Sequence, residues 1–289
     1  MAFDRKVELS VFTQTQKVDI SGLHIEFSIE RSIEFAENTA EFTIYNAKES
    51  TRKEVLKKGN NIPFKFGYAD ESLDETDEVG STLFAGNISK VTTAQVGPDW
   101  ITTILAASIQ SDQIPLQSTQ VKISYSKDVL LSQPLRDIAT AMGIVTVTGG
   151  TNANINLDNG FTHVGSARSG LKRLRDILKS NNVGLYIDND QIVVFNKGDR
   201  TSRFDPVFLD VESGLLSAED ITDFDNQEDK SQETLKRIGF ECIIIPKLQP
   251  RGLVTIKASQ VDGTFLIEKL AFDGDNFGGE NLCSGEATE

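Results

Sequence analysis

The two histidines, His24 and His163, are the side chains whose type best suits them to act as general bases near neutral pH. Nucleophilic catalysis needs such a base beside the nucleophile. His24 falls on the polar side of an alternating segment, His163 is predicted to lie in a loop, and the sequence has no G-x-S-x-G elbow. We therefore interpret both histidines as surface residues and predict no catalytic residue.

Motifs that bind phosphates, dinucleotides or catalytic zinc are also missing. The sequence contains no G-x-x-x-x-G-K-[ST], no dinucleotide glycine signature and no H-E-x-x-H. Paired carboxylates for glycoside hydrolysis need only proximity in space, and the chain is rich in acids, but nothing in the sequence singles out two of them. We expect no cofactor.

Two acidic stretches are candidates for calcium binding. The phrase Asp273-Gly274-Asp275-Asn276-Phe277-Gly278 resembles a calcium loop, but Phe277 stands where an oxygen ligand belongs and Ser284 replaces the bidentate glutamate. We predict a turn there and no metal. The run Asp70–Glu78 is interpreted as a solvated hairpin loop, with calcium binding or contact with a neighbouring chain as alternatives.

The two cysteines, Cys242 and Cys283, do not form a C-x-x-C pair. Cys242 precedes three isoleucines and is predicted to be a buried thiol. Cys283 lies in a polar, glycine-rich stretch. A redox or metal role is the alternative for Cys242.

Composition limits the classes of partner. The 289 residues exceed one typical domain, so two or three compact units are expected. With 43 acidic and 29 basic residues the formal charge is −14, which opposes general binding to nucleic acid or anionic membranes. There is no secretory signal and no run of about 18 apolar residues, so we expect a soluble chain made in the cytoplasm, with no membrane insertion.

Alternating segments dominate the first 111 residues. The stretch Ser21–Ala47 contains two of them, which the turn at Glu37-Asn38 folds into an antiparallel ribbon. The apolar face of this ribbon is formed by Leu23, Ile25, Phe27, Ile29, Ala40, Phe42 and Ile44. One helical insertion, Ser50–Lys58, ends at Gly59. This part is predicted to be all β.

The middle of the chain reads as α+β. Apolar residues at helical spacing predict helices at Val129–Met142 and Ala167–Asn181, and a hairpin turning at Asp188-Asn189-Asp190 follows. The second helix carries a basic cluster, which we interpret as a solvated face, with nucleic-acid binding or an intersubunit salt bridge as alternatives. The cluster consists of Lys172, Arg173, Arg175 and Lys179.

The last third returns to strands, at Ile238–Pro246, Leu253–Ser259 and Thr264–Phe272. The acidic segment Ala218–Glu233 is predicted to be a connecting loop outside the core. Residues beyond Asp275 are polar and glycine-rich, and we expect them to order only against a partner.

The order of these elements resembles the baseplate hub proteins of contractile-tailed phages, over almost the whole chain. The likeness starts with the Glu-Asn-Thr-Ala corner, the strand Phe42-Thr43-Ile44-Tyr45-Asn46 and the short Ser-Thr-Arg helix. It continues, in the order of that family, through Phe66-Gly67-Tyr68, Leu83-Phe84-Ala85-Gly86-Asn87-Ile88, Gly97-Pro98-Asp99-Trp100-Ile101-Thr102, Ser213-Gly214-Leu215-Leu216 and Asp273-Gly274-Asp275.

The resemblance implies a fold that is mainly β with an α+β insertion. The expected parts are a tail-tube-like β-barrel at 1–111, an α+β region at 112–199, a second such barrel at 200–275 and a polar tail at 276–289. It also implies a homotrimer that joins the sixfold tail tube protein to the threefold central spike protein and contacts other baseplate proteins. DNA would pass through its channel without specific binding, and the protein would reside in the virion tail baseplate.

Two other functions fit a β-rich chain. One is a cell-wall or carbohydrate-acting enzyme of a phage tail, and the other is a self-assembling tube protein, which generally needs one barrel and about half this length. The resemblance favours the hub, a structural protein and not an enzyme.

Overall fold

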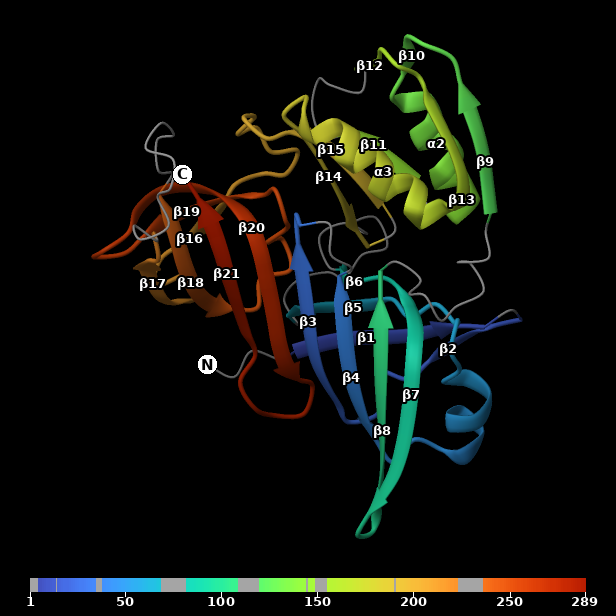
Figure 1. Ribbon diagram of the computed structural model, residues 1–289. Coiled ribbons are helices and arrows are strands. Elements are labelled where there is room, and N and C mark those ends of the chain that lie inside the picture. The colour runs from blue at the N-terminus through green and yellow to red at the C-terminus, as the bar shows by residue number, and fades with distance from the viewer. Residues whose placement is uncertain are drawn as a thin grey trace.

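The computed structural model describes residues 5–13, 15–34, 38–68, 82–108, 120–143, 145–148, 155–189, 191–222 and 236–289. The fold is mainly β, as predicted, and its largest element is a ten-stranded sheet (Figure 1). Its main path runs through β17 (Leu215–Asp220), β18 (Arg237–Ile243), β21 (Leu282–Thr288), β20 (Asp262–Asp275), β3 (Ile25–Ser32), β4 (Thr39–Tyr45), β8 (Asp99–Ala107) and β7 (Asn87–Val96). Off this path, β19 (Leu253–Lys257) pairs with β20 and β16 (Val207–Leu209) pairs with β19.

The first and last thirds of the chain meet inside this sheet. Strand β3 pairs antiparallel with β20, so that Ile29 lies opposite Phe272. The 14-residue β20 pairs with β19 in its first part and with β3 in its last part, and its pairing with β21 shifts register between Ile267 and Lys269. The thirds are therefore joined by backbone hydrogen bonds.

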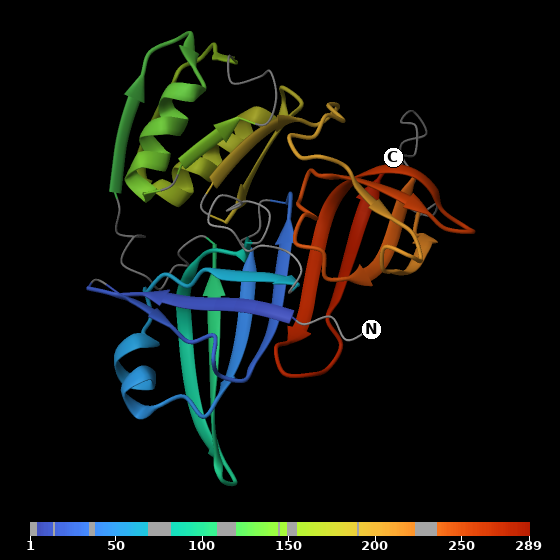
Figure 2. The same cartoon turned by 180° about the vertical axis from the view of Figure 1, so that it is seen from behind.

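A second, four-stranded sheet crosses one face of the first third (Figure 2). It consists of β2 (Lys17–Asp19), β1 (Arg5–Phe12), β5 (Phe64–Tyr68) and β6 (Thr82–Phe84). Phenylalanines fill the space between the sheets: the Phe64 ring lies 4.6 Å from that of Phe27 and 5.3 Å from that of Phe42. The predicted ribbon is confirmed, since its alternate residues from Ile25 to Ile44 are buried in this core.

The helical insertion is shorter than predicted. It is a π-helix, η1 (Thr51–Val55), after which Leu56 is buried. Gly59 has φ 91°, the left-handed conformation that the prediction assigned to it.

The middle of the chain is an α+β unit with its own core, as predicted. Both predicted helices are present, as α2 (Ser132–Met142) and α3 (Ala167–Lys179). The hairpin is formed by β14 (Val183–Asp188) and β15 (Gln191–Asn196). The remaining strands are β9 (Gln120–Tyr125), β10 (Val129–Leu130), β11 (Val145–Thr148), β12 (Asn156–Leu157) and β13 (Phe161–Ser166).

The expectation for the C-terminal tail is wrong at residues 282–288. These residues form β21, an interior strand that pairs with β18 on one side and β20 on the other. Its inward residues are small, so it lacks the apolar signal of a buried strand. Small size is needed at Gly285, where a Cβ atom would lie 2.3 Å from the Phe240 ring. The division of the chain into four segments stays a prediction.

The remaining expectations have different outcomes. Ala218–Asp220, predicted as loop, lie in the end strand β17. The acidic run Asp70–Glu78 and residues 223–235 lie outside the described residues. Within the described part of the chain, no helix is long and apolar enough to cross a bilayer.

Candidate functional site

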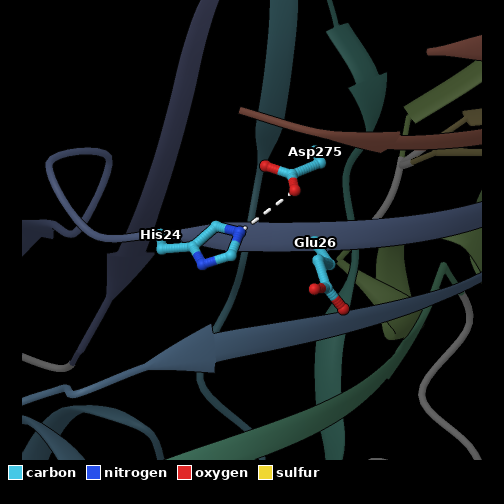
Figure 3. A group of neighbouring side chains, drawn as sticks. All are labelled: His24, Glu26 and Asp275. Atoms are coloured by element: carbon cyan, nitrogen blue, oxygen red, sulfur yellow. Dashed lines mark hydrogen bonds and ion pairs between the residues drawn. The ribbon is translucent and has the colours of Figure 1, made fainter. Parts of the chain in front are cut away.

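A cluster of polar side chains fastens the end of β20 to the start of β3 (Figure 3). His24 Nε2 lies 3.1 Å from Asp275 Oδ2, and the His24 ring stacks on Tyr45 with 4.4 Å between centroids. Tyr45 donates a 2.9 Å hydrogen bond to Glu26, and this carboxylate raises the pKa of the phenol. We call His24, Glu26, Tyr45 and Asp275 the clasp.

The turn after β20 holds the clasp in place. Asn276 accepts a 2.8 Å hydrogen bond from the Ile25 amide and donates one of 2.8 Å to the Leu23 carbonyl. The Arg5 guanidinium donates to the carbonyls of Gly278 and Gly279 from the neighbouring strand β1. Asp273–Asp275, predicted as part of a turn, form the end of β20, and the turn that follows them connects the first and last thirds.

His24 is not the plain surface residue that its alternation predicts. Its side chain keeps 32% of its exposure, because Tyr45 and Phe277 pack against the ring. The donor atoms of His24, Glu26 and Asp275 lie within 4.8 Å of one another and are of the types that a divalent transition metal takes. In this structure His24 and Asp275 are hydrogen-bonded to each other, and Glu26 accepts a hydrogen bond from Tyr45.

The clasp predicts a pH dependence of stability. Burial acts to raise the pKa of Asp275, but hydrogen bonds from the Phe277 amide and from His24 outweigh it and hold that pKa below its ordinary 3.8. A carboxyl with a lowered folded-state pKa stabilises the protein above its unfolded pKa and loses this contribution as the pH falls through the folded value. Asp275→Asn should therefore lower the urea midpoint at pH 7, and its difference from the wild type should shrink below about pH 4. The control Asp273→Asn removes an exposed carboxylate of the same strand, and an equal effect there would contradict the assignment.

The prediction that His163 is a surface residue in a loop is wrong. His163 lies in β13 and is 7% exposed, with Nε2 2.9 Å from the Ser166 carbonyl oxygen and 3.2 Å from Ser169 Oγ. Ser166 caps α3 by accepting the Ser169 amide, so His163 secures the start of that helix. The predicted loop is a strand here, which pairs antiparallel with β9.

A buried ion pair connects the middle unit to the sheet. Arg31 on β3 is fully buried and Asp188 at the end of β14 is 5% exposed. The Arg31 guanidinium donates hydrogen bonds of 2.7 to 3.0 Å to both carboxylate oxygens of Asp188. Gln249 accepts another bond from Arg31, and Asn38 donates to Asp188 over 2.9 Å. This pair was not predicted from the sequence, although Arg31 continues the buried alternation of Ile25, Phe27 and Ile29.

Both cysteines are buried free thiols that lie opposite each other on β18 and β21. Burial, together with Cys242, raises the pKa of the Cys283 thiol. A thiol in that state is a poor nucleophile. The prediction for Cys242 is confirmed, whereas Cys283 lies in the core and not in a polar tail.

The ends of the large sheet carry apolar side chains at the surface. At the β7 end Val96, just before the hairpin turn, is 58% exposed and Trp100 of β8 is 39% exposed. On β17, Leu216 is 57% exposed. Figure 1 shows the β7–β8 hairpin projecting beyond the rest of the sheet. An end strand with apolar neighbours is a template for pairing with another chain.

Comparison with known proteins agrees with this architecture. A model of the baseplate hub gp41 family matches residues 6–277. The chain belongs to the baseplate hub gp41 family. No curated protein sequence matches it.

Solved structures place this baseplate hub protein among tail proteins by fold. The 43 kDa tail protein of prophage MuSo2 from Shewanella oneidensis is similar with a TM-score of 0.62 and 12% identity, over 98% of each chain. A tail protein from Neisseria meningitidis MC58 has a TM-score of 0.64 and 10% identity, over 98% of this chain and 96% of that one. The E. coli c3393 protein, a type VI secretion component described as similar to T4 tail proteins gp27 and gp5, has a TM-score of 0.64 and 8% identity, over 96% of this chain and 76% of that one.

The family is a structural one of phage baseplates, which places this protein in the virion tail. The predicted family and the predicted mainly β fold class are confirmed, whereas the two tail-tube-like barrels stay a prediction. The clasp and the Arg31–Asp188 pair are the polar contacts that connect distant parts of the chain in this structure.

Proposed function

We propose that this hub protein forms a homotrimer that joins the sixfold tail tube to the threefold central spike. The observation that supports it best is the β3–β20 pairing, which makes one sheet out of the first and last thirds of the chain. If each third contributes one tail-tube-like barrel, three copies present six similar modules. A ring of this kind has sixfold character on one face and threefold symmetry on the other.

The two ends of the sheet supply the contacts of this ring. Strand β7 of one copy, beyond Ile88, and β17 of the next offer backbone donors and acceptors, and exposed apolar side chains lie beside them. Ile88 itself is already bonded to Gly59 and Asn60. Head-to-tail contacts between different surfaces close into a ring when the rotation between copies allows it. Such a contact repeated three times would place a channel on the axis.

DNA would pass through this channel without specific binding. The formal charge of −14 disfavours adhesion of phosphates to the general surface. We further propose that the protein is not an enzyme, is synthesised in the host bacterial cytoplasm and does not insert into membranes. Its partners would be the tail tube protein, the central spike protein and other baseplate proteins. Its role would be to match their symmetries and to transmit mechanical force between them.

The stoichiometry is the first test. Native mass spectrometry of the purified protein, at concentrations from about 1 to 100 μM, is expected to show a species of three chains, because end-strand pairing is concentration-dependent. The substitution Leu216→Lys, at an exposed position of β17, should lower the fraction of protein in the trimer. The circular dichroism spectrum of the monomer should stay unchanged. A hexamer or a persistent monomer would contradict the proposal.

A further inference from the structure

A cavity of about 680 Å³ lies where the three parts of the chain meet. It is lined by the end of β3, by α3 and the β14–β15 hairpin of the middle unit, and by β20 and β21. The volume falls in the range of small-molecule sites. A ligand in this place would touch all three parts of the chain at once.

The residues that line the cavity carry a net positive charge, whereas the whole protein has a net negative charge. The lining contains eight lysine and arginine side chains and four glutamates, whereas the whole chain has 29 basic and 43 acidic residues. Part of the basic cluster predicted to be a solvated face on α3, Arg175 and Lys179, belongs to this lining. Lys197 and Arg200 add cations from the segment after β15. A positive cavity in an acidic chain attracts anions selectively.

Two of the arginines are buried and differ in their partners: Arg31 is paired with Asp188, and Arg251 forms no ion pair in the described chain. Arg31 Nη1 is buried and has no hydrogen-bond partner among the described residues. Arg251 is 7% exposed, stacks on Phe195 at 4.5 Å and donates to the Asp199 carbonyl. Within the described chain it has no carboxylate inside 4.0 Å. Burial lowers the pKa of Arg251, the direction expected of a cation removed from water.

Asp188 is the counter-charge of Arg31, whereas Arg251 has no carboxylate within ion-pair distance in the described chain. Burying a cation without a counter-charge is costly, and an anion bound beside Arg251 would remove that cost. Guanidinium groups bind phosphate and carboxylate oxygens through two parallel hydrogen bonds. The excess of cations over carboxylates suits a ligand that carries several charges on few atoms. A side chain from a partner protein would bring one charge and would also bring backbone groups that need partners of their own.

We propose that this cavity binds a compact polyanion of the phosphate class, held by Arg251 together with the exposed Lys179 and Lys197, and that the bound anion fastens the middle unit to the sheet. This site is independent of the trimer proposed above. It gives the hub protein a small-molecule ligand that its structural role does not require. Polyphosphates and nucleotides share the chemistry, and the experiment separates them.

The test is calorimetric titration of the full chain with tripolyphosphate at constant ionic strength, with ATP, orthophosphate and citrate as the other arms. Tripolyphosphate is expected to bind one site per chain at least tenfold more tightly than orthophosphate. ATP binding more tightly still would identify a nucleotide as the source, within the same proposal. Tighter binding of citrate than of every phosphate, or no saturable binding, would overturn it.

Variants decide whether the cavity is the site. Lys179→Gln with Lys197→Gln removes two exposed cations of the lining and should weaken tripolyphosphate binding at least fivefold. The matched control, Lys172→Gln with Lys257→Gln, removes two exposed lysines that are not among the lining residues and should leave binding unchanged. Equal weakening in both would mean non-specific attraction and would overturn the proposal. Arg251→Met should abolish binding, provided that its circular dichroism matches the wild type.

Discussion

Asp188→Ala is expected to lower the free energy of unfolding by about 3–5 kcal/mol, because it leaves the Arg31 charge buried without its counter-charge. Arg31 is fully buried and donates three hydrogen bonds to Asp188. Breaking such a pair from one side retains the cost of burying the remaining charge. Urea unfolding followed by circular dichroism measures the effect, and a loss below about 1 kcal/mol would mean that Arg31 reaches water.

The double variant Arg31→Met, Asp188→Leu separates charge from packing. It removes both charges and keeps most of the volume, so it should recover much of the stability lost in Asp188→Ala. Glu286→Gln is the surface control, because the Arg237–Glu286 pair is exposed by 46% and 41% and contributes little. Failure of the double variant to recover would place the effect in packing and the Asn38 hydrogen bond.

Phe42→Pro is expected to abolish folding of the first third and incorporation into particles. Phe42 is fully buried, and its ring lies 5.3 Å from that of Phe64 and 6.2 Å from that of Phe84. Losing the ring costs about 3–5 kcal/mol, and proline also removes a backbone donor. Strand β4 is paired on both sides, with β3 and β8, so this donor lies inside the ladder.

The experiment supplies the variant to phage that lack their own copy and counts tailed particles by electron microscopy. Phe42→Leu keeps a buried apolar side chain and the backbone donor, and it should support assembly. Glu41→Ala, an exposed position of the same strand, should behave as the wild type. Normal particles from Phe42→Pro would contradict the central place of β4.

Local patterns of the sequence were sufficient for most individual elements. Period-two alternation predicted β3 and β4, since one face of each strand is buried and the other is wet. Helical spacing with Gly143 after the last turn predicted α2, and Gly143 has φ 70°. The order of short motifs predicted the family. Such features depend on neighbours within a few residues, so the chain reveals them directly.

Contacts between residues far apart in the sequence determined the features that local patterns did not predict. Strand β21 is buried by β18 and β20, although its small residues carry no apolar pattern. Arg31 and Asp188 are separated by 157 residues, and His24 and Asp275 by 251. Nothing within either neighbourhood specifies the partner, because these positions become close only when β3 pairs with β20 and the middle unit packs on the sheet. The clasp and the Arg31–Asp188 pair are therefore determined by the tertiary structure. Most strands and helices of the hub protein, in contrast, can be predicted from local sequence patterns.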